Sequence, residues 1–137
     1  MAPSAGFCVS YKLDLLNGVH QPGDSYYIAL YTSAATISPS TTAYTSSGAV
    51  SGTGYVAGGQ ALAGISIAIS GSAAYLTWTS PVWPSSTLSG VTAALIYNAT
   101  RSNKALAVLT FTPVSSTDNA LTVTLPAAGA SSTIVLN

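Results

Sequence analysis

The feature that most limits the fold of this chain is a series of short apolar segments separated by turn residues. In residues 25–32, apolar side chains alternate between two faces of an extended chain, with Tyr26, Ile28 and Leu30 on one of them. Further segments of this kind lie at residues 41–46, 61–70, 73–79, 91–98, 104–112, 120–126 and 131–137. Short strands at this spacing predict an all-β fold, an antiparallel β-sandwich of about eight strands that is jelly-roll-like. Other Greek-key orders of the same strands fit the pattern equally well.

The N-terminal part carries one helical pattern. Val9, Leu13 and Leu16 recur at spacings of four and three, which gives a single apolar stripe. We expect a short helix at residues 10–17, docked by that stripe, after an N-terminal arm at residues 1–9. No shift in composition divides the rest, so the 137 residues are predicted to form one domain, 1–137.

Charge is scarce in this chain. Only 4% of the residues are charged and the formal net charge is zero, whereas soluble domains carry roughly 25%. Three basic residues are too few for binding to nucleic acid, which depends on neutralising several phosphates. A surface with so little repulsion favours self-association. The apolar runs are far shorter than the about 20 residues of a spanning helix, and the first residues lack a signal-peptide pattern, so we expect neither membrane insertion nor export.

The segment at residues 93–111 reads as a hairpin with an unusual distribution of polarity. Both faces of both arms are apolar, and the polar tip between them holds Arg101 and Lys104. Since an antiparallel strand with one wet face alternates apolar and polar residues, something must cover the outer face. We expect a second copy or a partner protein to do so. The tip itself is either a solvated turn or a contact for acidic groups of that partner.

Residues that perform chemistry are few. One histidine, one cysteine and three aspartates do not make a convincing metal or catalytic set, and we predict no catalytic, cofactor-binding or metal-binding residues. His20 is interpreted as a surface or loop histidine and Cys8 as a small apolar side chain. Gly23, Asp24 and Ser25 match the start of a GDS-type esterase signature, but the same residues also make a simple turn before a strand. We predict that the protein is not an enzyme.

Two further features concern loops. Trp83 lies between Val82 and Pro84 in a predicted loop, where it is either an anchor at an interface or a plug at one end of the sandwich. The candidate interface residues are therefore Trp83, Arg101 and Lys104. The glycine-rich residues 50–64 predict a long loop or bulged strand entry with positive φ angles or close backbone approach.

Three stretches of the chain resemble a family of small structural proteins of tailed bacteriophages. These stretches are residues 27–62, 93–111 and 121–137, and the resemblance covers most of the chain from about residue 12 to the end. Its strongest motifs are IALYTSAAT, SGTGYVAGG and the hairpin IYN…SNKALAVL. The resemblance implies a β-sandwich or jelly-roll subunit that forms a dimer or trimer. It also implies a non-enzymatic role in the virion, most simply that of a capsid decoration (cement) protein bound to the major capsid protein on the outside of the head.

On this interpretation the protein is made in the host cytoplasm and ends on the capsid surface. Three alternatives stay open at this point. The first is another virion part, such as a head fibre base, a head–tail joining piece or a tail protein. The second is a carbohydrate-binding sandwich that uses Trp83 and loop tyrosines, and the third is an esterase with Ser25 as its nucleophile.

Overall fold

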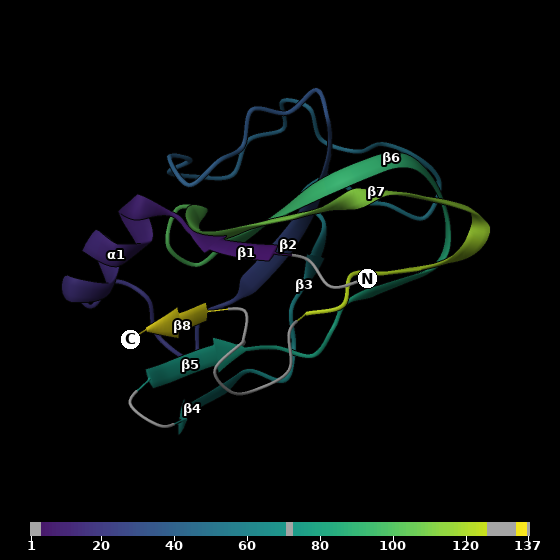
Figure 1. The fold of residues 1–137 in the computed structure, drawn as a ribbon. Coiled ribbons are helices and arrows are strands. Elements are labelled where there is room, and N and C mark those ends of the chain that lie inside the picture. Colours follow the sequence, from purple (N-terminus) through teal and green to yellow (C-terminus); the bar gives the residue numbers. More distant parts are fainter. Residues whose placement is uncertain (1–3, 71–72, 126–133, 137) are drawn as a thin grey trace.

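The fold is given by a computed structural model, which describes residues 4–70, 73–125 and 134–136. In chain order its elements are β1 (Ser4–Phe7), α1 (Val9–Leu16), β2 (Tyr26–Thr32), β3 (Gln60–Ala61), β4 (Ser66–Ser70), β5 (Ala73–Thr77), β6 (Val82–Asn98), β7 (Lys104–Thr122) and β8 (Ile134–Leu136) (Figure 1). The predicted all-β fold with one short N-terminal helix is thereby confirmed.

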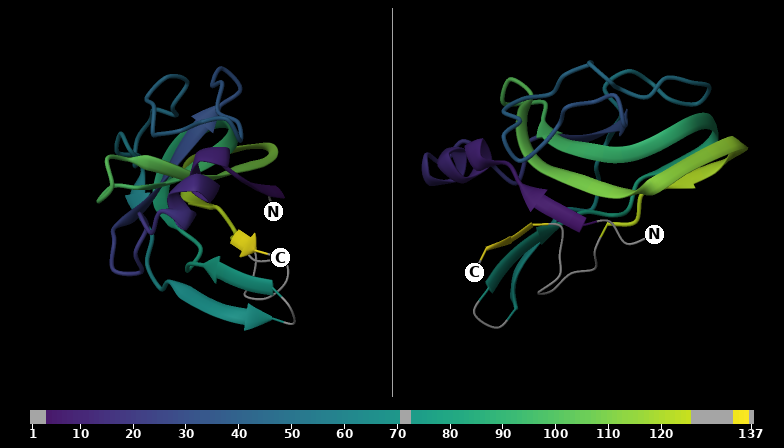
Figure 2. Two further views of the ribbon diagram at one scale, coloured as in Figure 1. Left: turned by 90° about the vertical axis from the view of Figure 1, so that its left-hand side faces the viewer. Right: turned by 45° about the horizontal axis from the view of Figure 1, so that its top comes forward.

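The strands form two antiparallel sheets. The large sheet has five strands in the order β1-β7-β6-β2-β3, and the small sheet has three in the order β4-β5-β8. Residues 33–59 run over one side of the large sheet, and the β4–β5 hairpin lies at the opposite end of the molecule in all views (Figures 1 and 2). This strand order does not confirm a jelly-roll sandwich, because one long β6–β7 hairpin dominates the large sheet.

The β6–β7 hairpin is much longer than the pattern predicts. Its strands have 17 and 19 residues. The predicted loop around Trp83 and the residues between the predicted strands 104–112 and 120–126 are therefore both part of a strand. Breaks in the pairing register occur between Trp83 and Ser86 and between Val91 and Ala93. Pro84 lies inside the first break, and Pro113 lies opposite the second. A proline has no N–H to donate, and an irregular ladder tolerates it where a regular one does not.

The apolar arms of the hairpin are covered by the chain itself. All residues from 93 to 98 and from 105 to 109 are buried. Residues of the 33–59 segment pack on them, with the ring of Tyr44 stacked on that of Tyr97 at 4.9 Å between centroids. The Tyr97 hydroxyl donates to the carbonyl oxygen of Gly58 at 2.7 Å. The arms therefore need no second subunit, and the self-association expected from them requires another surface.

Two of the predicted strands, at residues 41–46 and 61–70, differ from those in the structure. Residues 41–46 form no strand, although Ala43 makes an isolated bridge with Lys104. The predicted strand 61–70 is divided into β3 and β4. Gly59, with a φ of +82°, lies so close to β2 that a Cβ there would overlap the carbonyl oxygen of Ile28, which confirms the close backbone approach predicted for the glycine-rich segment.

Helix α1 is present as predicted, but a different side faces the protein. Val9, Leu13 and Leu16 are exposed, while Tyr11 is buried and Leu15 is half-buried. The prediction that this apolar stripe docks the helix on the rest of the protein is therefore wrong. The N–H of Cys8 donates to Leu106 and the N–H of Val9 to Pro39, at 2.9 and 2.8 Å. Since these bonds hold the start of the helix beside β7, they set its rotation and turn Tyr11 inward.

Candidate functional site

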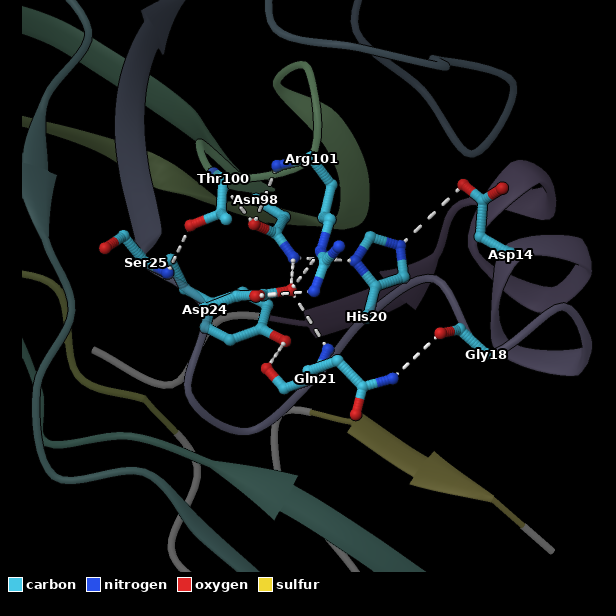
Figure 3. Close-up of polar contacts among 10 residues, drawn as sticks. Asp14, Gly18, His20, Gln21, Asp24, Ser25, Asn98, Thr100 and Arg101 are labelled. Atoms are coloured by element: carbon cyan, nitrogen blue, oxygen red, sulfur yellow. Dashed lines mark hydrogen bonds and ion pairs between the residues drawn. The ribbon is translucent and has the colours of Figure 1, made fainter.

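The two basic residues at the hairpin tip form ion pairs within the chain. Nε and Nη2 of Arg101 donate to the two carboxylate oxygens of Asp24 at 2.8 and 3.0 Å (Figure 3). Nζ of Lys104 lies 3.3 Å from Oδ1 of Asp14. Both basic side chains remain partly exposed, so their place in a partner interface stays a prediction. They are, however, already held by the segment from α1 to β2.

Asp24 is the centre of this polar cluster. Its side chain is only 6% exposed, and Oδ2 also accepts from Nδ2 of Asn98 at 2.9 Å and from the N–H of Gln21 at 3.0 Å. The hydrogen bonds from Arg101 are the main reason that the pKa of Asp24 lies well below its usual value. The carboxylate is therefore ionised at neutral pH and ties the turn before β2 to the hairpin tip.

Asn98, the last residue of β6, connects both parts of the cluster. Its Oδ1 accepts from the N–H groups of Thr100 and Arg101 at 3.0 and 3.2 Å, which shapes the turn after β6. Its Nδ2 contacts Asp24 and also lies 3.0 Å from Nδ1 of His20. Since an amide nitrogen only donates, Nδ1 must be the acceptor, and the neutral imidazole carries its proton on Nε2.

His20 lies in the loop between α1 and β2, which fits the loop alternative of the prediction, but its side chain is buried and not at the surface. Its side chain is 3% exposed, and Nε2 lies 3.7 Å from Oδ2 of Asp14. Burial lowers the pKa of His20, although the nearby carboxylates of Asp14 and Asp24 act in the opposite direction. The ring also contacts Tyr11, at 5.2 Å between centroids, so it connects the polar cluster to the packing of α1.

The contacts of residues 23–25 bear on whether this segment is an esterase motif or a turn. Asp24 is bound to Arg101 and Asn98, and the N–H of Ser25 donates to Oγ1 of Thr100 at 2.8 Å. These contacts match the alternative interpretation of Gly23, Asp24 and Ser25 as a turn before a strand. In the described part of the chain, no group of three or more His, Cys, Asp and Glu residues could hold a metal ion. Within the same residues, no helix is long and apolar enough to cross a membrane.

Trp83 lies in β6 and is 4% exposed. Its ring packs beside that of Tyr55, with 6.0 Å between centroids. The prediction of an anchor in an exposed loop is therefore wrong for this residue. The other interpretation fits, since the ring fills space between the far end of the hairpin and the covering loop. Trp78, which belongs to the predicted strand segment 73–79, is buried against Tyr26.

An apolar cleft lies next to the polar cluster, between α1, the turn before β2 and the small sheet. Its volume is about 160 Å³, and its lining includes Tyr11, Leu15, Tyr26, Ile67 and Leu76. Ile67 and Ile69 of β4 are exposed and extend this apolar surface toward the edge of the small sheet. The alternation of Ile65, Ile67 and Ile69 in the sequence predicts a strand, but it does not show that its apolar face is uncovered.

The sequence does not show that these polar residues form one cluster. Asp24 and Arg101 are 77 positions apart, and no local pattern joins them. The one signal was Asn98 directly before the turn residues 99–103, a common place for a side chain that caps its own turn.

No protein-family model, no curated protein and no solved structure matches the chain.

Proposed function

We propose that the protein is a non-enzymatic structural protein of a tailed-bacteriophage virion, a capsid decoration (cement) protein. It binds the major capsid protein on the outside of the head, associates with itself as a dimer or trimer, and stabilises the shell. The resemblance of the motifs IALYTSAAT, SGTGYVAGG and IYN…SNKALAVL to small phage structural proteins supports the virion role. A protein that stabilises a shell needs contact area in many copies and needs no catalytic turnover.

The observation that carries the proposal is the near absence of uncommitted charge on a partly apolar surface. Four of the six charged side chains form ion pairs within the chain, Asp24 with Arg101 and Asp14 with Lys104. The other two, Lys12 and Asp118, lie at exposed positions. Large apolar side chains are exposed at Val9, Leu13, Leu16, Val56, Ile65, Ile67, Ile69 and Val82. Such a surface suits association through shape and apolar area, as in permanent interfaces.

The test is the copy number of this chain in purified particles, measured by quantitative mass spectrometry against the major capsid protein. Hundreds of copies in a fixed ratio to the capsid protein are expected. A dozen or fewer would instead indicate a part of the portal or tail vertex, such as a head–tail joining protein. Absence from particles would contradict both virion roles.

A jelly-roll-like sandwich, the fold that the resemblance implies for such a subunit, stays a proposal. The antiparallel sheets support it only at the level of an all-β fold. An experimental structure of the protein bound to capsids would decide it through the strand order of the complete chain.

A further inference from the structure

Strand β4 is an edge strand of the small sheet. The order of that sheet is β4-β5-β8, and β4 pairs with β5 along its whole length, from Ser66 opposite Thr77 to Ser70 opposite Ala73. Within the described residues no strand lies on its other side. Half of the backbone N–H and C=O groups of such a strand point away from the sheet, and they can pair with another strand.

The edge lacks the devices that usually prevent such pairing. Natural edge strands are protected by charged side chains, prolines or bulges. The segment from Ser66 to Ser70 contains no charged residue and no proline, and its pairing register with β5 shows no bulge. No charged residue occurs anywhere between Ser25 and Thr100. The side chains of Ile67 and Ile69 are 56% and 79% exposed, so pairing there would also remove apolar surface from water.

The sequence of β4 is complementary to a second copy of itself. Residues 66–70 read SIAIS in both directions, with Ala68 at the centre. In an antiparallel pair related by a two-fold axis at Ala68, Ile67 of one copy lies opposite Ile69 of the other, and Ser66 lies opposite Ser70. Every position thus faces a residue of its own kind, and no charge faces another charge. A two-fold interface must be self-complementary in this way.

We propose that two copies of this chain join by antiparallel pairing of β4 with β4 about Ala68, which makes one sheet continuous across the dimer. The four isoleucines at positions 67 and 69 then form one apolar contact, beside the cleft that Ile67 lines in each copy. This inference names the surface for the self-association proposed above. It does not depend on the virion role, because the dimer is a property of the purified protein.

The first test measures the mass of the purified protein by light scattering after size-exclusion chromatography and by sedimentation equilibrium. The wild-type protein is expected to be a dimer. Ile67→Lys places a charge in the interface and is expected to weaken dimerisation by about tenfold or more. Leu13→Lys is the matched control, because Leu13 is 62% exposed on the apolar stripe of α1, and it is expected to leave the dimer intact. Circular dichroism checks that both variants are folded.

Three results would overturn the proposal: a wild-type protein that is monomeric or trimeric, an Ile67→Lys variant that stays fully dimeric, or a Leu13→Lys variant that dissociates. The last result would place the interface on α1. None of them bears on the copy number in particles, so failure of this inference and failure of the proposed virion role can be told apart.

The second test examines the register by cross-linking under mild oxidation. In a Cys8→Ala background, Ala68→Cys brings two thiols to directly opposite positions, where the Cα separation allows a disulfide. A covalent dimer is expected on a non-reducing gel. Ser66→Cys is the control, because residue 66 faces residue 70 of the other copy and its thiols remain far apart. Equal cross-linking of both variants, or none with Ala68→Cys, would contradict the pairing about Ala68.

Discussion

At the scale of single residues, the scarce charges of this chain are used to hold one junction. Asp24 accepts hydrogen bonds from Arg101, Asn98 and Gln21, and its side chain is almost fully buried. Removing this acceptor takes away one partner of the buried Asn98 amide, and a buried donor without its acceptor costs more than an ordinary hydrogen bond contributes. The junction joins the turn before β2 to the hairpin tip, two parts of the chain that are distant in sequence.

Asp24→Asn tests this junction. The substitution replaces the carboxylate by an amide that cannot accept the bidentate pair from Arg101, so we expect the free energy of unfolding to fall by about 1–3 kcal/mol, the cost of losing a buried acceptor. Urea denaturation followed by circular dichroism measures it. Asp118→Asn is the matched control, since Asp118 lies at an exposed position of β7, and it should change stability by less than about 0.5 kcal/mol. Equal effects of the two substitutions would contradict the role of Asp24.

The stability of the protein is expected to fall in acid in two steps. The pKa of His20 is lowered from 6.5 by burial, so the unfolded chain takes up a proton first and stability decreases as the pH falls below 6.5. The pKa of Asp24 is lowered from 3.8, chiefly by the hydrogen bonds from Arg101, so a second decrease begins below 3.8. In both cases the contribution is complete above the unfolded pKa and is lost toward the folded pKa.

Urea midpoints measured from neutral to acid pH check this profile. His20→Gln has no titrating ring, and we expect it to remove the first step while leaving the second. A first step of unchanged size in this variant would show that another group causes it.

At the scale of elements, α1 shows how a neighbouring strand sets the orientation of a helix. β1 pairs with β7, with Gly6 opposite Val108, and the chain turns into the helix directly afterwards. Because the first helical N–H groups are bound to β7 and to the covering loop, the rotation of the helix is set before its own apolar stripe can dock. Tyr11 consequently contacts the core, and Leu13 faces outward.

Two substitutions in α1 test this orientation. Tyr11→Ala removes a buried ring and is expected to lower the free energy of unfolding by about 3–5 kcal/mol. Leu13→Ala removes an exposed side chain and is expected to change it by less than about 0.5 kcal/mol. Chemical denaturation of both variants gives the comparison. A larger loss for Leu13→Ala than for Tyr11→Ala would mean that the predicted stripe docks after all.

At the scale of the whole molecule, the internal ion pairs leave a surface that is nearly uncharged and partly apolar. If the proposed capsid role holds, little of the binding energy comes from charge. The screening length at about 1 M salt is about 3 Å, which suppresses interactions between exposed charges and leaves apolar contacts intact.

The protein should therefore stay on particles in molar sodium chloride. Sedimentation of particles after a salt wash, with the protein quantified in the pellet and the supernatant, measures retention. Release by salt would contradict binding through apolar area.

The local features of this protein can be predicted from its sequence. Short apolar segments bounded by turn residues predict β2 and the inner parts of β6 and β7, and residues 99–103 predict the turn between β6 and β7. The helical spacing of apolar residues places α1 within one residue of its observed start. These features depend on residues that are close in sequence, and a local sequence pattern can therefore predict them.

The contacts between those elements are seen only in the folded protein. These contacts join parts of the chain that are far apart in sequence. They include the pairing of Arg101 with Asp24, the burial of His20 and Trp83, the rotation of α1 and the covering of the hairpin arms by residues 33–59. An apolar segment shows that it must be buried, but it does not show by which other segment. That choice depends on how all the elements fill one core, which no local pattern contains.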